Sequence, residues 1–263
     1  RLRTVNTFRA STPVSYRAGD QPNNALSLNV LEPGDVAATA GTSGVIYGIS
    51  DQFTYDDHSR INTFAHVNHT TCHKRLGVLL CINGTGILNR WIKNMAGEHL
   101  SYAEINQEAS KVKPGSDGII VLPFGNGAER MLENKIVGAH ICNLDLNTHT
   151  KGHLYRAAQE GIAFAFRYGL DIMKENGMTP QVIRAGKANM FLSNIFTDCF
   201  VNTLNIPVEM YNSDGSTGAA IGAGMGAKLY KSSKEAFQHF KPLQLLEPDK
   251  KKNCEEFYNK WLH

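Results

Sequence analysis

A single carboxylate near the start of the chain, Asp20, is the residue whose setting first suggests chemistry. It lies in YRAGDQPNNA (residues 16–25), after a glycine and directly before Gln21. A carboxylate can take the proton of an attacking hydroxyl group, and such general-base catalysis contributes about 10²- to 10⁴-fold to a rate. An aspartate after a glycine is also an ordinary turn former or helix cap. By itself, therefore, Asp20 identifies no reaction.

Four loops punctuated by glycine suggest a second kind of chemistry, the binding of phosphate. They span residues 19–24, 41–44, 125–127 and 214–218. Glycine lets backbone N–H groups approach an anion closely, and a helix N-terminus adds free N–H groups and a favourable dipole. Because hairpins and helix ends need glycine anyway, no single loop proves a phosphate site. The chain has no G-x-x-x-x-G-K-[ST] sequence, which excludes a P-loop protein.

Metal and disulfide chemistry have weaker support. His66, His69 and His73 have the spacing of a loose ligand cluster, but no nearby carboxylate completes it, so we expect loop or surface histidines. The five cysteines are widely spaced and form no C-x-x-C, which favours neither a disulfide framework nor a zinc site. This use of cysteine fits a reducing cytoplasm.

Bulk composition excludes several classes of protein. The 263 residues suit one large domain or two small ones, with 42% hydrophobic and 19% charged residues, as in ordinary globular proteins. The net charge of +3 is too small to argue for nucleic acid or an anionic membrane as a partner. The sequence contains no secretory signal or membrane span. Because it opens with Arg1 and not methionine, we expect a fragment or a processed product.

The elements that must position these residues fall into two parts. In the first part, hydrophobic patterning predicts a hairpin around GTSG at 34–50, a buried strand at 75–82, helices at 85–97 and 101–112, and a strand entering a glycine-rich loop at 118–130. The second part alternates helices and strands at 153–177, 181–186, 189–205, 207–212 and 217–230. Such alternation argues for an α/β layer. A short helix, a proline-punctuated linker and an amphipathic helix follow residue 234.

Two of these helices carry more specific predictions. Asn189 lies near the predicted cap of the helix at 189–205. The helix at 217–230 has a face of small residues, formed by Ala219, Gly222, Ala223 and Gly226. Such a face lets another helix approach closely; a glycine-rich binding loop is the alternative.

Taken in order, four segments resemble the FGGY family of carbohydrate kinases. They are TPVSYRAGDQPNNALSLNVLEPGDVAATAGTSGVIYG, GIIVLPFGNGAER, RAAQEGIAFAFRYGLDIMKENG and IRAGKANMFLSNIFTDCFVNTLNIPVEMYNSDGSTGAAIGAG. The order of the motifs is specific, although none of them is specific alone. The resemblance implies an α/β fold of the RNase H-like, actin-like ATPase type. Nothing in the chain resembles the family's first domain, which opens with an Asp-x-Gly-Thr phosphate loop, so we expect the second domain of a two-domain kinase.

The expected domain organisation follows from this resemblance. Residues 1–15 would be a lead-in from the absent N-terminal domain, 16–232 the FGGY C-terminal domain, and 233–263 a helical tail. The missing N-terminal domain would then be a partner within the same protein, and the isolated chain would be inactive or nearly so. A homodimer is compatible with this organisation.

The resemblance also implies a reaction, the phosphorylation of a sugar hydroxyl by ATP with Mg²⁺. The xylulose kinase branch is the most similar, which implies D-xylulose as the acceptor. A sibling kinase acting on another ketose, a polyol or gluconate stays open. A non-catalytic regulatory or assembly domain is the alternative from another class, and Asp20 beside an intact GTSG argues against it.

Roles for single residues come from the same resemblance. Asp20 matches the general base of sugar phosphorylation, and Gln21 beside it would contact the sugar. The turn residues would bind phosphate: Gly41, Thr42, Ser43 and Gly44. Gly186 and Asn189 match the loop on the adenosine side. The family usually has a run of glycines there, so Lys187 would either crowd the nucleotide or bond to its phosphates.

Overall fold

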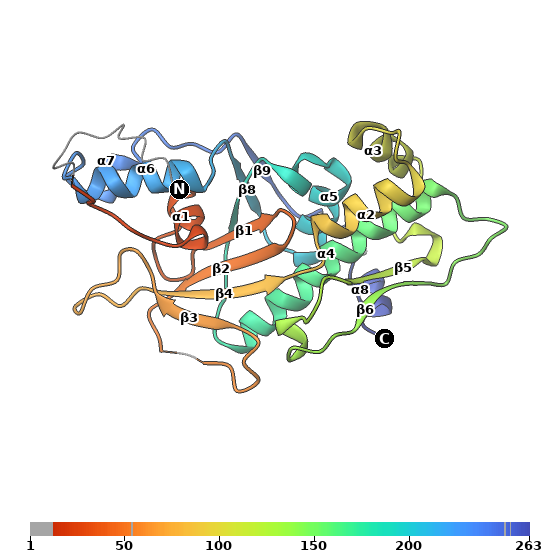
Figure 1. Ribbon diagram of the computed structural model, residues 1–263, viewed down its shortest axis with the longest axis horizontal. Helices are drawn as coiled ribbons and strands as arrows, with labels where there is room; N and C mark the ends of the chain where they lie inside the picture. The colour runs from red at the N-terminus through yellow and green to blue at the C-terminus, as the bar shows by residue number, and fades with distance from the viewer. Residues whose placement is uncertain (1–12, 54, 250, 253) are drawn as a thin grey trace, which may run out of the picture.

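The computed structural model of the chain describes residues 13–53, 55–249, 251–252 and 254–263. Its centre is a seven-stranded sheet in the order β3-β4-β2-β1-β7-β8-β9 (Figure 1). The strands are β1 (Val36–Ala40), β2 (Gly44–Ser50), β3 (Asn62–Ala65), β4 (Leu76–Ile82), β7 (Ile183–Gly186), β8 (Val208–Tyr211) and β9 (Gln244–Leu246). Strands β1, β7 and β8 run parallel, and the other neighbouring pairs are antiparallel. The order and directions of β4-β2-β1-β7-β8 are those of the RNase H-like fold, which confirms the predicted fold class.

A smaller sheet and the helices surround this centre. Strands β5 (Ile120–Phe124) and β6 (Gly138–Cys142) form an antiparallel pair. The α-helices are α1 (Asp20–Ser27), α2 (Gly86–Ala96), α3 (Tyr102–Ser110), α4 (Lys151–Glu175), α5 (Asn194–Leu204), α6 (Gly215–Gly226), α7 (Ser233–Ala236) and α8 (Cys254–Leu262). Three 3-10 helices connect them, η1 (Ser116–Gly118), η2 (Arg130–Leu132) and η3 (Asn189–Leu192).

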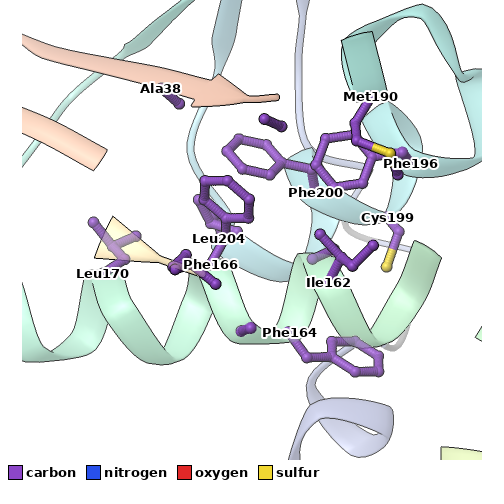
Figure 2. Packing of buried hydrophobic residues seen from close by; sticks show 14 of the residues in the cluster. Ala38, Ile162, Phe164, Phe166, Leu170, Met190, Phe196, Cys199, Phe200 and Leu204 are labelled. Carbon is purple, nitrogen blue, oxygen red and sulfur yellow. The ribbon is translucent and has the colours of Figure 1, made fainter. Parts of the chain in front are cut away.

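The two faces of the large sheet pack against different helices, because successive side chains of a strand point to opposite faces. Ile46 of β2 joins the main core, which α4 and α5 cover, whereas Tyr47 joins a smaller core beneath α1. In the main core, Phe166 of α4 packs against Phe196 and Phe200 of α5 with ring centroids 5.2 to 6.1 Å apart (Figure 2). Truncating such a buried ring to alanine costs about 3–5 kcal/mol of stability. These rings therefore fix α4 and α5 beneath the sheet.

The predicted small-residue face is confirmed on α6, with a change in its members. Gly222 and Gly226 face the segment that contains α1, and Gly218 lies beside them. Ala223 is exposed and Ala219 is half-buried. The face therefore follows three glycines at four-residue spacing, and the other element that packs on it is α1.

Several local predictions are confirmed in detail. The GTSG segment joins β1 and β2 as an antiparallel hairpin in which Ala40 lies opposite Gly44. The helix predicted at 101–112 forms as α3, and Ser101 and Glu104 make a capping box at its start. Gly177 has a φ of +86°, a left-handed conformation that glycine adopts without steric cost, and it follows the end of α4.

Other local predictions are wrong. The helix predicted at 189–205 is broken: η3 comes first, and the Ser193 side chain caps α5 by accepting a hydrogen bond from the Phe196 N–H. Asn189 is therefore not the cap of this helix, and its φ is +54°. The small-residue helix ends at Gly226 and not near residue 230. Helix α1 and strands β3, β6 and β9 were not expected.

The helix predicted at 85–97 forms as α2, and only part of its apolar surface is buried. Leu88 and Ile92 join the main core, but Trp91 and Met95 are 53% and 70% exposed. Only one narrow face of α2 therefore packs into the main core. The neighbouring large side chains remain on the surface.

The three histidines do not form a metal site. His66 is buried, with Nδ1 2.8 Å from the Tyr47 hydroxyl and Nε2 3.2 Å from the Val30 carbonyl oxygen. Burial lowers the pKa of His66 to about 4. His66 lies in the loop after β3, which fits the expected loop position, but it is not on the surface. His69 accepts a hydrogen bond from the Arg75 N–H. No group of three His, Cys, Asp or Glu side chains within the described residues is placed to hold a metal, and the five thiols are free.

The C-terminal segment packs onto the domain. The ring of Phe240 stacks on Tyr211 with centroids 4.4 Å apart, and Trp261 donates a hydrogen bond to the Val121 carbonyl oxygen. The expected lead-in at 1–15 lies mostly outside the described residues, and the boundaries at 15 and 232 stay predictions. None of the helices in the described segments is both long and apolar enough to cross a bilayer.

Candidate active site

The GTSG turn is held by the N-terminus of α2. The Gly86 N–H donates to the Gly41 carbonyl oxygen at 2.9 Å, and the Ile87 N–H donates to the Thr42 carbonyl oxygen at 3.1 Å. The first N–H groups of a helix have no partner within the helix, so the turn satisfies two of them. The turn and α2 therefore form one rigid unit.

The two glycines of the turn face different surroundings. A Cβ on Gly41 would lie 3.7 Å from Nδ2 of Asn189, an ordinary contact. A Cβ on Gly44 would lie 2.6 Å from the Phe166 ring and 2.7 Å from Oγ1 of Thr85, so close packing with the core requires glycine there. Neither glycine has a positive φ. A Cβ on Gly41 would thus point toward Asn189, whereas a Cβ on Gly44 would point into the core.

A pocket of about 380 Å³ opens beside this turn. Its lining residues are Ala40, Gly41, Thr42, Gly86, Ile87, Asn89, Arg90, Tyr102, Asn106, Asn189, Met190, Leu192 and Ser193. Apolar side chains and an aromatic ring form part of the wall, and amides, hydroxyls and a guanidinium group form the rest. Such a lining can hold a flat polar ring together with an attached anion.

The structure brings three of the predicted binding residues together in this pocket. Gly41, Thr42 and Asn189 line it, although Asn189 is distant from the others in sequence. Ser43 and Gly44 continue the turn outside the lining. A larger cavity of about 610 Å³ lies between α8 and β5, and none of the predicted site residues lines it.

Six polar or glycine residues of the pocket were missed from the sequence. One is Ser193, the N-cap of α5, and the other five are Gly86, Asn89, Arg90, Tyr102 and Asn106. These five come from α2 and α3, which pack beside the turn. Gly86 and Arg90 are four residues apart, so they lie on one face of α2. The four-residue spacing of Gly86 and Arg90 could have indicated this face from the sequence, because the buried residues Leu88 and Ile92 mark a different face of α2.

A buried network holds the floor of the pocket. Gln159 of α4 is fully buried and donates to the Oδ1 atom of Asn106 at 3.0 Å. The Ser193 hydroxyl donates to Oε1 of Gln159 at 2.5 Å. One glutamine amide therefore fixes two pocket residues that come from different elements.

The loop after β7 approaches the pocket through Asn189. Gly186 does not line the pocket, but a Cβ on it would lie 2.7 Å from the Ser213 carbonyl oxygen, so glycine permits a close approach to the loop after β8. The Lys187 N–H donates to the Tyr211 carbonyl oxygen at 2.8 Å. Lys187 is exposed and forms no ion pair with a carboxylate of the described segments. Its ammonium group is therefore not neutralised by the protein there.

Asp20 is the first residue of α1 and follows the extended N-cap Gly19. Its side chain is exposed, and its Oδ1 atom accepts a hydrogen bond from the Gln21 N–H at 2.8 Å. The Oε1 atom of Gln21 is buried and has no hydrogen-bond partner among the described residues. An unpaired buried acceptor costs about 1–3 kcal/mol. Both side chains therefore have capacity for a ligand.

Asp20 and the turn lie toward the same region of the sheet. Ala25 of α1 and Leu28, which follows the helix, pack on the sheet face that contains Val45, the residue after the turn. Val45 pairs with Cys81 of β4. Burial raises the pKa of the Cys81 thiol, the Arg130 guanidinium lowers it, and the Asp20 carboxylate raises it.

Two of the four glycine loops have a structural role in the fold. The Oδ1 atom of Asp214 accepts hydrogen bonds from the Ser216 hydroxyl and from the N–H groups of Thr217 and Ser216, which lower the pKa of this carboxyl. The N-terminus of α6 is thus already occupied by an anion. In the loop at 125–127, Asn126 donates to the Asn83 carbonyl oxygen, and Gly127 has a φ of +84°.

A family profile, related sequences and a solved structure were compared with this chain, and all of them are carbohydrate kinases. The profile of the C-terminal domain of the FGGY family of carbohydrate kinases matches residues 36–227. The xylulose kinase of Lactococcus lactis is 29% identical over 265 residues, 97% of this chain and 51% of that protein. The gluconokinase of Bacillus subtilis is 32% identical over 163 residues, 58% of this chain and 31% of that protein. The crystal structure of xylulose kinase from Rhodospirillum rubrum matches with a TM-score of 0.80 at 23% identity, over 93% of this chain and 49% of that one.

This chain thus spans about half, or less, of the length of the relatives that it matches. The structural match shows the shared fold. The profile match runs from β1 to the end of α6 and includes the turn, the pocket and the loop after β7. The chain therefore belongs to the FGGY family of carbohydrate kinases, to whose C-terminal domain its residues 36–227 correspond.

Proposed function

We propose that this chain supplies the nucleotide-side and catalytic-base domain of an ATP-dependent sugar kinase. The observation that carries the proposal is the pocket beside the GTSG turn, in which Gly41, Thr42 and Asn189 converge within a chain of this kinase family. The pocket volume of about 380 Å³ falls within the range of small-molecule sites. ATP is the proposed phosphate donor.

The base and the turn have separate tasks in this reaction. The Asp20 carboxylate takes the proton of a sugar hydroxyl while the hydroxyl oxygen forms its bond to the γ-phosphorus and the bond to the ADP oxygen breaks. The hydroxyls of Thr42 and Ser43 and the backbone N–H groups of the turn donate to the phosphate oxygens. These donors stabilise the charge of the phosphoryl group in the transition state.

The far end of the pocket suits the adenosine part of the nucleotide. Ile87, Met190 and Leu192 offer apolar surface, and Tyr102 adds an aromatic ring. Asn189 and Asn106 offer amide groups that can bond to a base or a ribose. Arg90 has no ion pair with a carboxylate of the described residues, so its charge remains available to the nucleotide.

The residues present also fit Mg²⁺. This ion usually keeps several waters and is bound by one or two carboxylates together with substrate phosphates. The hydroxyls of Thr42 and Ser43 are oxygen donors that can contact the waters and phosphates around such an ion, while Asp20 stays free to accept the sugar proton. Bound Mg²⁺ would neutralise charge on the transferring phosphate, and these residues would hold it through the phosphates and water.

D-Xylulose is the proposed acceptor, because a xylulose kinase matches over 97% of the chain. Gluconate is the second candidate, because a gluconokinase is 32% identical over the segment that it shares. Most contacts to the sugar would come from a partner N-terminal domain, of the kind that the longer relatives have. Asp20 and Gln21 would provide the contacts on this side of the cleft.

The test uses the full-length protein in which this chain is joined to its N-terminal domain. A coupled assay of ADP release is run with D-xylulose, other ketoses, polyols and gluconate. We expect sugar-dependent turnover, and we expect Asp20→Asn to lower kcat by about 10²- to 10⁴-fold with little change in ATP affinity. No ADP release above background with any of these compounds would favour a non-catalytic regulatory or assembly domain. Turnover of Asp20→Asn near the wild-type value would remove Asp20 from the mechanism.

A further inference from the structure

Helix α1, which begins with Asp20, lies against the glycine face of α6. A Cβ on Gly218 would lie 1.9 Å from the Asn23 carbonyl oxygen and 2.9 Å from the Ser27 nitrogen. A Cβ on Gly222 would lie 2.5 Å from the Tyr16 ring, and one on Gly226 would lie 2.0 Å from the Ser15 carbonyl oxygen. Residues at four-residue spacing share one helix face. No side chain larger than hydrogen fits between α6 and this segment at any of the three positions.

Hydrogen bonds close the segment around Asp20. The Tyr16 hydroxyl donates to the Oδ1 atom of Asn23 at 2.8 Å, and the Asn23 amide donates to the Ala18 carbonyl oxygen at 3.3 Å. Asp20 therefore lies between two residues, Tyr16 and Asn23, that are bonded to each other. Both of them contact the glycine face, so the position of the carboxylate depends on that face.

The helix that carries the glycines is itself fixed. Asp214 caps its N-terminus, as described above, and the Ser213 hydroxyl donates to the Ser27 carbonyl oxygen at 2.9 Å. This bond joins the last turn of α1 to the loop that enters α6 from β8. Helix α1 thus packs on both the sheet and α6, and α6 is the element that contacts the residues on either side of Asp20.

We propose that the glycine face of α6 (Gly218, Gly222 and Gly226) positions Asp20 for proton transfer, and that Gly218 is its most sensitive member. This inference rests on the proposed function. The Cβ at residue 218 would meet backbone atoms of α1 itself, the helix that begins with Asp20, and backbone cannot turn aside as a flexible side chain can. At Gly222 and Gly226 the Cβ would meet Tyr16 and Ser15, which precede that helix. A methyl group at residue 218 must therefore push α1 away from α6. A misplacement of about 1 Å at a reacting group can cost 10²-fold in rate.

The test is Gly218→Ala in the full-length protein, measured by ADP release with the preferred sugar. We expect kcat to fall by about 10- to 100-fold, while KM for ATP stays near the wild-type value because the nucleotide pocket lies on other elements. The matched control is Gly215→Ala in the same helix. A Cβ there would lie 3.8 Å from the Asp20 carbonyl oxygen and from the Asn24 nitrogen, which is an ordinary contact. We expect this control to retain wild-type kcat.

A double-mutant cycle separates positioning from general damage to the fold. If Gly218 acts through Asp20, adding Gly218→Ala to Asp20→Asn removes no further activity, because the base is already absent. An equal loss in both backgrounds would overturn the inference and leave the proposed function intact. A normal kcat for Asp20→Asn alone would instead overturn the proposed base.

A second variant covers the case in which Gly218→Ala does not fold. Tyr16→Phe keeps the ring against Gly222 and removes only the bond to Asn23. We expect a smaller loss of kcat, a melting temperature near wild type, and again no further loss in the Asp20→Asn background. An unchanged kcat together with an unchanged KM for the sugar would count against the inference.

Discussion

Gly86 and Gly41 are in direct backbone contact: the N–H of Gly86 donates to the carbonyl oxygen of Gly41 at 2.9 Å. A Cβ on Gly86 would lie 2.4 Å from the same oxygen. The start of α2 therefore fixes the turn that faces the pocket, and it does so only while residue 86 is glycine. This contact makes α2 part of the site, although none of its residues was predicted there.

The first prediction concerns this contact. Gly86→Ala should displace the GTSG turn and lower ATP affinity, because the methyl group would meet a carbonyl oxygen that has little freedom to move. We expect a loss of stability of about 1–3 kcal/mol, as for other overpacked sites. Isothermal titration with MgATP and thermal unfolding measure the two effects. Asn94→Ala, at an exposed position of the same helix, is the control and should change neither.

The second prediction concerns the glycine of the turn that faces the pocket. Gly41→Val should reduce ATP affinity by at least about tenfold, because its branched side chain would fill the space between the turn and Asn189. Gly41→Ala is the matched control, since a single methyl group makes only ordinary contacts at 3.7 Å. Nucleotide titration of both folded variants measures the difference. If Gly41→Val bound ATP and turned over normally, the turn would have only a structural role.

The third prediction concerns the amide that holds the pocket floor. Gln159→Leu preserves most of the side-chain volume but leaves Asn106 and Ser193 without their shared partner. Each buried polar group left unpaired costs about 1–3 kcal/mol, so stability and ATP affinity should both fall. Gln107→Leu on the exposed side of α3 is the control. Equal ATP affinities of the two variants would show that the network does not shape the pocket.

The elements that could be predicted from the sequence are those with a clear hydrophobic periodicity or distinctive turn residues. The hairpin around GTSG, the apolar strand before α2 and the long α4 depend on period and turn chemistry that a few residues display. Helix α1 has no such pattern: DQPNNALS contains a proline and two asparagines, which are weak helix formers. It forms because α6 and the sheet supply its packing, with Pro22 tolerated in the first turn.

The site was predictable only in part for a related reason. Gly41, Thr42 and Asn189 were found because they lie on loops whose composition is unusual. The contributions of α2 and α3 depend on how these helices pack beside the turn, which no local pattern records. The short strands β3, β6 and β9 were missed because each has a neighbour on one side only, so its residues need not form an apolar run.

The fourth prediction concerns the pH dependence of stability. His66 is neutral in the folded state with a pKa of about 4, whereas an unfolded histidine titrates near 6.5. Between these values the unfolded state binds more protons, so stability falls as the pH decreases through this window. The expected loss between pH 8 and pH 5 is about 2 kcal/mol from this residue.

Denaturant unfolding at the two pH values measures this effect, and comparison of variants isolates it from other titrating groups. In His66→Gln the difference in unfolding free energy between pH 8 and pH 5 should shrink by about that amount. His58→Gln is the control, because the His58 side chain is 59% exposed. If His66→Gln kept the full pH dependence of the unfolding free energy, the inference that His66 is neutral in the folded state would be wrong.

The last prediction concerns the isolated chain, which carries the pocket but not a partner N-terminal domain. A ligand raises apparent stability only when its concentration exceeds its dissociation constant. With one wall of the cleft absent, ATP should bind weakly through the turn and Asn189, so millimolar MgATP should give only a small rise in melting temperature. D-Xylulose should give none, because Asp20 and Gln21 alone offer few contacts. Exposed apolar side chains such as Trp91 and Met95 should favour self-association.

A thermal-shift series and a coupled ADP assay on these 263 residues decide the point. The control is the same chain with Gly41→Val, in which the small MgATP shift should disappear if the nucleotide occupies the pocket beside the turn. Light scattering at several concentrations measures self-association. Strong xylulose-dependent ADP release from the isolated chain would contradict the proposal, because it would require a complete sugar site and phosphate site within this one domain.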